Sequence, residues 1–273
     1  MISSRRNSLV RLVRSLSSRE GRDKSELILL EGTNLFLETL KTSQLPREII
    51  ATTRWLEEHY EILENLPEYV PIRTVTEDVL EFALTTKNPD GVATLYPQKA
   101  LPKPKNKPNF ILALDRLQDP GNMGSVFRTA LAADVEMIWL ALGADPLSPK
   151  VLRSSAGSVL KMPFLRFQSS EEESLKIFAK KLEFASSDGY QLVATVLSSS
   201  LAEGHALPYW EINWEEPTIL VLGNEGSGLH PLIKSICKKW VTVPHSKEVE
   251  SLNVASVAVP MLLERRRAKM TLR

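Results

Sequence analysis

One short stretch of the chain combines residues that suit the binding of a negatively charged group. It reads DPGNMGSVFRTA, residues 119–130, and it joins the apolar run FILALD to a helical pattern of apolar residues. Gly121 and Gly124 permit tight backbone geometry where the helix starts, and the free N–H groups of a helix start attract anions. Arg128, expected about one turn inside the helix, adds a planar fork that matches phosphate or carboxylate. The alternative is structural: a turn with Asn122 as the N-cap and a solvated arginine.

A second glycine-rich stretch, LVLGNEGSGL at residues 220–229, follows another apolar run. Its spacing is G-x-x-G-x-G, whereas the dinucleotide-binding fingerprint is G-x-G-x-x-G. Neither stretch contains the Gly-Lys-Ser/Thr of a nucleotide-triphosphate loop, so both classes of enzyme are disfavoured. A simple glycine-rich turn explains the glycines, but it leaves Glu225, a single carboxylate at a strand end, without a role.

The third stretch, VPHSKEVESLNVASVAVPMLLERRR, covers residues 243–267. Ser251 is a plausible N-cap for a helix whose apolar face begins at Val254, and Arg265–Arg267 would complement the dipole at its basic end. These features are structural. Asn253 is a poor helix former in the expected first turn, and is therefore a candidate for chemistry.

The elements that must position these stretches fall into two α/β regions. Upstream, four apolar runs alternate with helical patterns and predict a small domain over residues 1–96. The stretch 97–108 holds four prolines and four lysines and predicts a linker. Downstream, residues 109–273 contain apolar runs separated by helix-length segments, as in a mainly parallel sheet buried on both faces. Ligands of such sheets usually bind beyond the carboxyl ends of the strands, which is where the three stretches lie.

Composition narrows the class of protein. The net charge of +1 excludes a polycationic coat, the single Cys237 indicates a reducing compartment, and the histidines lack metal-ligand spacing, so we expect no metal. No run is long enough to span a membrane, and we expect a cytoplasmic protein.

The basic charge is concentrated at the start of the chain, because residues 1–24 hold seven Lys/Arg against two acids. This Arg- and Ser-rich segment could be an organellar transit peptide. Alternatively, Leu9, Leu12, Val13 and Leu16 mark the apolar face of a folded basic helix, which is the reading we favour.

Together the three stretches, in this order, resemble the signature motifs of the SpoU/TrmH family of RNA ribose 2'-O-methyltransferases. LLEGTNLFLETL and NPDGVATLY, near residues 30 and 90, resemble the ribosomal-protein-L30e-like RNA-binding domain that many members carry in front. The resemblance implies a SPOUT fold, an α/β domain with a C-terminal trefoil knot that binds S-adenosylmethionine. It also implies a homodimer whose subunits complete each other's active sites.

The resemblance also implies roles for individual residues. Those expected at the transfer site are Asn122, Arg128, Glu225, Ser251 and Asn253, and those expected at the cofactor are Thr195, Leu222, Gly223, Val243 and Leu252. Arg128 would grip the RNA phosphate beside the target ribose and stabilise the nascent alkoxide. The family proposal of a general base is less compatible with a guanidinium pKa above about 12. One departure is Lys247, which stands where the family usually has a glycine.

The front domain is expected to choose the RNA, with Arg5, Arg6, Arg11 and Arg14 as candidates for phosphate contact or, alternatively, as solvated surface residues. Members with this domain mostly modify large-subunit ribosomal RNA, which we favour over transfer RNA. A non-catalytic RNA-binding or ribosome-assembly protein of the same fold is the remaining alternative.

Overall fold

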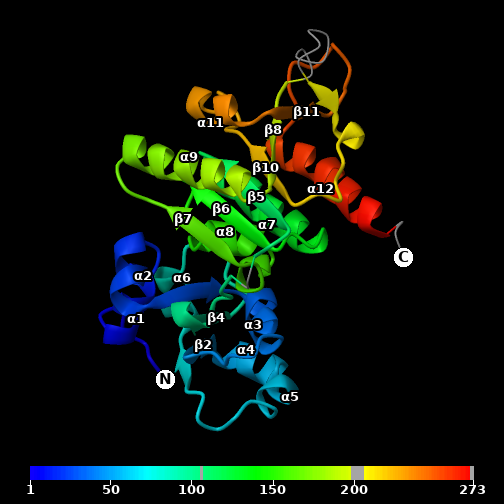
Figure 1. Cartoon of the computed structure of the whole chain (residues 1–273). Helices are drawn as coiled ribbons and strands as arrows, with labels where there is room; N and C mark the ends of the chain where they lie inside the picture. The colour runs from blue at the N-terminus through cyan, green and yellow to red at the C-terminus, as the bar shows by residue number, and fades with distance from the viewer. Residues whose placement is uncertain (105–106, 198–205, 271–273) are drawn as a thin grey trace. The chain divides into compact units, whose positions relative to one another are not determined.

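The computed structural model describes residues 1–104, 107–197 and 206–270 (Figure 1). The chain divides into two compact units: Met1–Leu101 with Asp145–Lys161, and Pro102–Ala144 with Met162–Arg273. The division after Leu101 falls inside the Pro/Lys-rich stretch, of which residues 105 and 106 lie outside the described ranges. Asp145–Lys161, which the sequence analysis assigns to the second domain, groups with the first unit.

The first unit is built on a mixed four-stranded sheet with the strand order β1-β4-β2-β3. Both β1 and β2 run antiparallel to β4, and β3 runs parallel to β2. The strands are β1 (Leu27–Glu31), β2 (Glu48–Thr52), β3 (Ile72–Val75) and β4 (Val92–Pro97). The helices are α1 (Ser8–Ser15), α2 (Arg19–Ser25), α3 (Thr33–Leu40), α4 (Thr53–Glu58), α5 (Tyr60–Leu63), α6 (Glu77–Ala83), η1 (Gln98–Ala100), α8 (Pro149–Ser154) and η2 (Ser158–Leu160).

The basic N-terminal segment folds as the amphipathic helix α1. Asn7 caps this helix by accepting a hydrogen bond from the Leu9 N–H at 2.8 Å. Val10, Val13 and Leu16 are buried in one hydrophobic cluster with residues of β1, β2 and α6. The prediction of a folded helix is therefore confirmed. Its arginines face the solvent, as expected for the polar side of such a helix.

A buried carboxylate, Glu31 at the end of β1, holds the segment Asp145–Lys161 in the first unit. It accepts hydrogen bonds from the backbone N–H and hydroxyl of Thr85 (2.9 and 2.8 Å) and of Thr86 (3.1 and 2.5 Å). It also forms an ion pair with Arg153 of α8. Two further ion pairs, Arg22–Asp145 and Glu38–Lys161, attach the two ends of the same segment.

The second unit contains a seven-stranded sheet with the order β7-β6-β5-β10-β8-β11-β9, in which every strand pair is parallel. The strands are β5 (Phe110–Asp115), β6 (Met137–Ala141), β7 (Phe164–Phe167), β8 (Gln191–Thr195), β9 (Leu207–Pro208), β10 (Thr218–Leu222) and β11 (Lys239–Thr242). The helices are α7 (Pro120–Ala132), α9 (Glu171–Ser187), η3 (Tyr209–Glu211), α11 (Pro231–Ile236) and α12 (Val254–Met270). The predicted parallel α/β architecture is confirmed; only the two-residue strand β9 was not expected.

Helices cover both faces of this sheet (Figure 1). Alternate residues such as Ile111 and Val221 pack with Phe178 of α9 and Ile233 of α11 on one face. On the other face α7 and α12 pack against each other, and Phe127 of α7 meets the ring of Phe164 edge to face. Because both faces are buried, the strands read as continuous apolar runs in the sequence.

The C-terminal helix α12 is anchored by a buried arginine. The Arg265 guanidinium lies 4.1 Å from the centre of the Phe110 ring and donates to the Asn109 carbonyl at 3.3 Å, and burial lowers its pKa to about 10. Arg266 forms an ion pair with Asp134 (2.5 Å), and Arg267 forms one with Glu264 (2.7 Å). The predicted basic end Arg265–Arg267 is confirmed for Arg267, which lies in the last turn together with Lys269; Arg265 and Arg266 lie before that turn, because α12 continues to Met270. The trefoil knot stays a prediction.

No helix in the described ranges is long and apolar enough to cross a bilayer. Nor does any group of three or more His, Cys, Asp or Glu side chains there have the arrangement of a metal site.

Replacing Glu31 by alanine should lower the free energy of unfolding by about 3 kcal/mol, because Arg153 and both threonines lose a buried acceptor. The measurement is urea unfolding followed by circular dichroism. Arg54→Met is the matched control: it breaks the ion pair with Glu58, whose partners are exposed, and should cost less than about 1 kcal/mol. Equal losses in the two variants would show that the Glu31 cluster does not stabilise the unit.

Candidate functional site

The three stretches singled out in the sequence meet at one edge of the seven-stranded sheet. They follow β5, β10 and β11, whose carboxyl ends point the same way because the strands are parallel. At this edge lies a cavity of about 320 Å³. Its walls come from the ends of β8 and β10, the loops that follow them, and the start of α12.

The cavity brings together several residues that the family resemblance assigns to a cofactor. Thr195, Gly223 and Leu252 line it. Leu222 is buried in β10 directly before the lining residues, and Val243 is half-buried outside the lining. Lys247, at the unusual position in the loop after β11, is exposed and also lies outside the wall.

The loop after β10 is closely folded on itself, which explains its first glycine. A Cβ atom at Gly223 would lie 2.5 Å from the backbone of Gly228 and Leu229, so only glycine fits there. Asn224 closes the turn: its Oδ1 accepts from the N–H groups of Gly226 and Ser227, both at 3.0 Å. The glycines of this stretch thus serve a tight turn that forms part of the cavity wall.

Glu225 joins this loop to the one after β5. Its carboxylate accepts hydrogen bonds from the backbone N–H groups of Gln118 (3.2 Å) and Asp119 (3.1 Å) and from Asn122 Nδ2 (3.2 Å). Partial burial raises the pKa of Glu225, but these hydrogen bonds outweigh it and the net shift is downward. The side chain is therefore an ionised acceptor at neutral pH rather than a proton donor.

The same contacts correct the anion-binding interpretation of the first stretch. Helix α7 begins at Pro120 with Asp119 as its N-cap, which accepts from the Asn122 N–H at 2.7 Å. Carboxylates of the protein, from Asp119 and Glu225, thus already occupy N–H groups at this turn. The suggestion of Asn122 as the N-cap is also wrong.

Two asparagines connect the first and third stretches. Asn253 Nδ2 donates to Asn122 Oδ1 at 2.9 Å. Asn253 Oδ1 accepts from the backbone N–H of Ala255 at 2.8 Å, so Asn253 caps α12. The expectation that Ser251 is this cap is wrong; Ser251 is exposed and lines the cavity. Glu225, Asn122 and Asn253 thus form a continuous hydrogen-bonded chain across the site.

Two residues outside the predicted site, Asp115 and Arg116, support the loop after β10. The buried Asp115 carboxylate accepts from the His230 N–H at 2.6 Å and from Arg116 Nε at 3.0 Å. Arg116 has a left-handed backbone (φ 57°), and its carbonyl accepts from Asn224 Nδ2 at 2.9 Å. The available signal was a charged residue, Asp115, closing an otherwise apolar run.

Arg128 stands apart from this chain of contacts. It lies in the third turn of α7, further from the helix start than the one turn expected, and its side chain is exposed. Among the described residues its side chain has no hydrogen-bond or ion-pair partner. Glu225, the carboxylate of the site, accepts from the backbone N–H groups of the loop after β5 and makes no ion pair with Arg128. The guanidinium is free to contact a ligand.

The candidates for RNA contact divide into two pairs in the first unit. Arg14 donates to the Phe82 carbonyl at 2.9 Å, and Arg5 lies 3.8 Å from the Asp78 carboxylate. Both guanidiniums lie over the Phe82 ring. Arg6 and Arg11 are exposed, and their side chains have no partner in the described part of the chain.

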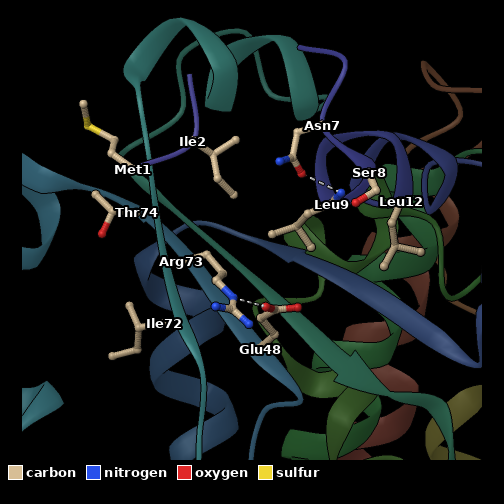
Figure 2. Close-up of a pocket in the computed structure, with 10 residues that line it drawn as sticks. All are labelled: Met1, Ile2, Asn7, Ser8, Leu9, Leu12, Glu48, Ile72, Arg73 and Thr74. Carbon is tan, nitrogen blue, oxygen red and sulfur yellow. Dashed lines mark hydrogen bonds and ion pairs between the residues drawn. The ribbon is translucent and has the colours of Figure 1, made fainter. Parts of the chain in front are cut away.

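A cavity of about 660 Å³ opens in the first unit where the start of α1 faces the edge strand β3 (Figure 2). Asn7 and Ser8 line one side, and the Arg73–Glu48 ion pair (2.8 Å) lines another. The cavity therefore lies beside the basic helix, and its wall is mostly polar.

Comparison with known proteins agrees with this geometry. Residues 109–263 match the sequence model of the SpoU rRNA methylase family, and residues 7–94 match that of the MRM3-like substrate binding domain. The chain is 38% identical, over 97% of its length and 93% of the relative's, to an uncharacterised tRNA/rRNA methyltransferase of Synechocystis. It is 29% identical to the 23S rRNA (guanosine(2553)-2'-O)-methyltransferase RlmP of Bacillus subtilis, covering 94% and 95% of the two chains.

Among solved structures, the AdoMet-bound rRNA methyltransferase of Sinorhizobium meliloti is similar over 97% of both chains, with a TM-score of 0.77 and 26% identity. The two family models together cover most of the chain, and the first of them includes the three loops described above. The chain therefore belongs to the SpoU rRNA methylase family and is an RNA methyltransferase with the SPOUT fold and a substrate-binding domain in front.

Proposed function

We propose that this enzyme transfers a methyl group from S-adenosylmethionine to a ribose 2'-hydroxyl of ribosomal RNA, with the cofactor in the cavity at the sheet edge. The observation that carries the proposal is the convergence of Thr195, Gly223 and Leu252 on a cavity of about 320 Å³. That size suits a small organic ligand, and the tight turn after β10 and the start of α12 give it a largely preformed wall. The cavity residues therefore fit the cofactor.

When bound, S-adenosylmethionine supplies an electrophilic methyl group, so the protein has to position the ribose oxygen and stabilise its developing negative charge. Arg128 is the residue we assign to that charge and to the adjacent phosphate, since its guanidinium is exposed and unpaired among the described residues. The chain Glu225, Asn122, Asn253 holds the three loops in register. Ser251, in the wall, lies on the transfer side of the cavity in this proposal.

Ribosomal RNA is the proposed substrate, because the family is one of rRNA methylases and RlmP is named for a 23S rRNA ribose. The front unit would bind the RNA, with Arg6 and Arg11 as the candidates that retain a free guanidinium. A ribosomal RNA substrate and the presence of a single cysteine are both consistent with a cytoplasmic enzyme, which is the localisation we propose.

The proposed enzyme is a homodimer that associates through α12. Val259 and Leu263 lie one turn apart on this helix and are 40% and 42% exposed, so they form adjacent apolar positions on its outer face. A second subunit covering them would complete the site near Arg128, as the family resemblance implies.

The test of the function is transfer of labelled methyl from S-adenosylmethionine to ribosomal RNA and to transfer RNA that lack the modification. Arg128→Ala should lower the rate about 100- to 1000-fold and leave cofactor affinity nearly unchanged, because only a donor to the developing charge is lost. Lys180→Ala removes an exposed cation of α9 and should have no effect.

Label found only in transfer RNA would contradict the assignment of ribosomal RNA as the substrate. If neither RNA is labelled and the protein does not bind S-adenosylmethionine, the alternative of a non-catalytic RNA-binding protein is favoured. Equal loss of rate and cofactor affinity in Arg128→Ala would exclude the role given to that residue.

Variants of Asn253 separate its two hydrogen bonds. Asn253→Ala should lower the free energy of unfolding by about 1 kcal/mol, because the cap of α12 is lost. Asn253→Asp keeps the cap acceptor but not the donor to Asn122, so stability should stay near wild type while methyl transfer falls about tenfold. Urea unfolding and the transfer assay measure the two effects. Full activity of Asn253→Asp would mean that the link to Asn122 is not needed.

A charge on the outer face of α12 tests the dimer. Leu263→Glu should convert the protein to monomers in analytical ultracentrifugation and abolish most activity. Ile177→Glu on α9 is the control, since Ile177 is equally exposed at 43%. A monomeric wild-type protein, or a dimer that survives Leu263→Glu, would contradict this interface.

A further inference from the structure

Lys234 is a cation in the cavity wall that has no acidic partner. It belongs to α11, is half-buried, and its Nζ lies 4.5 Å from the centre of the Trp240 ring. Two carboxylates, Glu225 and Glu250, line the same cavity, but within the described ranges neither comes within ion-pair distance of Lys234. Glu225 is already occupied by the loop after β5.

The surroundings hold this lysine in place without neutralising it. Its ammonium group lies over the Trp240 ring, whose indole N–H donates to the Cys237 carbonyl at 2.8 Å. A partly desolvated cation gains most from an anionic acceptor, which the protein does not supply here. A ligand in the cavity that carries an anionic group would supply this acceptor.

We propose that Lys234 binds the α-carboxylate of the methionine portion of the cofactor. This inference rests on the methyl-transfer function proposed above. S-adenosylmethionine has no phosphate, and its α-carboxylate is its only anionic group, so a cation in the cavity wall has one charged counterpart in this ligand. Lys234 would thereby select a methyl donor that carries the amino-acid carboxylate.

The test is a comparison of two ligands that differ only in that group, S-adenosylmethionine and decarboxylated S-adenosylmethionine. Affinities are measured by isothermal titration calorimetry with wild-type protein and with Lys234→Met, which keeps an unbranched side chain of similar length and removes the charge. The variant should lose about tenfold to a hundredfold in affinity for S-adenosylmethionine and none for the decarboxylated ligand. Lys234→Arg should restore most of the loss, and Lys238→Met, an exposed lysine of the same region outside the wall, should change neither affinity.

The outcomes separate this inference from the proposed function. If Lys234→Met weakens both ligands equally, or neither, the carboxylate contact is overturned while the cofactor assignment stands. If wild-type protein binds neither ligand, both proposals fail.

Discussion

The site depends on one carboxylate that spans two strand ends. Glu225 extends from the loop after β10 and binds the backbone before α7 together with Asn122, whose own oxygen accepts from Asn253 at the start of α12. Asn122 lies more than 100 residues away from both Glu225 and Asn253 in the sequence. The hydrogen bonds between these side chains nevertheless hold the three loops together. The parallel sheet makes this possible, because it presents all three loops at one edge, and the hydrogen bonds then fix their distances.

The division of labour among the charged groups follows from this arrangement. The carboxylates of Glu225 and Asp115 accept hydrogen bonds from backbone N–H groups, and these bonds stabilise the loops. Arg128 and Lys234 are the opposite case, since neither has an acidic partner in the described part of the chain. The carboxylates maintain the shape of the site, while the free cations are available to an anionic RNA backbone and to the cofactor.

The sheet could be predicted from the sequence because strands buried on both faces leave continuous apolar runs, and the loops could be predicted because they follow those runs. The caps could not. Several residues with good capping side chains occur close together before α7 and α12, and only the three-dimensional contacts decide between Asp119 and Asn122, or between Ser251 and Asn253. With Asn122 as the cap, α7 would begin three residues later, which brings Arg128 almost one turn closer to the expected helix start. The two-residue strand β9 is too short to leave a pattern, and the role of Asp145–Lys161 depends on partners about 120 residues away.

The segment Asp145–Lys161 also has consequences for the order in which the two units fold during synthesis and for the design of fragments. The first unit lacks part of its own structure until residue 161 has been synthesised, because Arg22, Glu31 and Glu38 find their ion-pair partners only in Asp145–Lys161. Ribosomal synthesis thus delivers β5, α7 and β6 of the second unit before the first unit is complete, so the two units mature in an interleaved order rather than one after the other. A fragment that ends at the proline-rich stretch would keep the hydrogen bonds of Glu31 to Thr85 and Thr86 but lose its cationic partner Arg153, so a fragment meant to reproduce the first unit has to include residues 145–161.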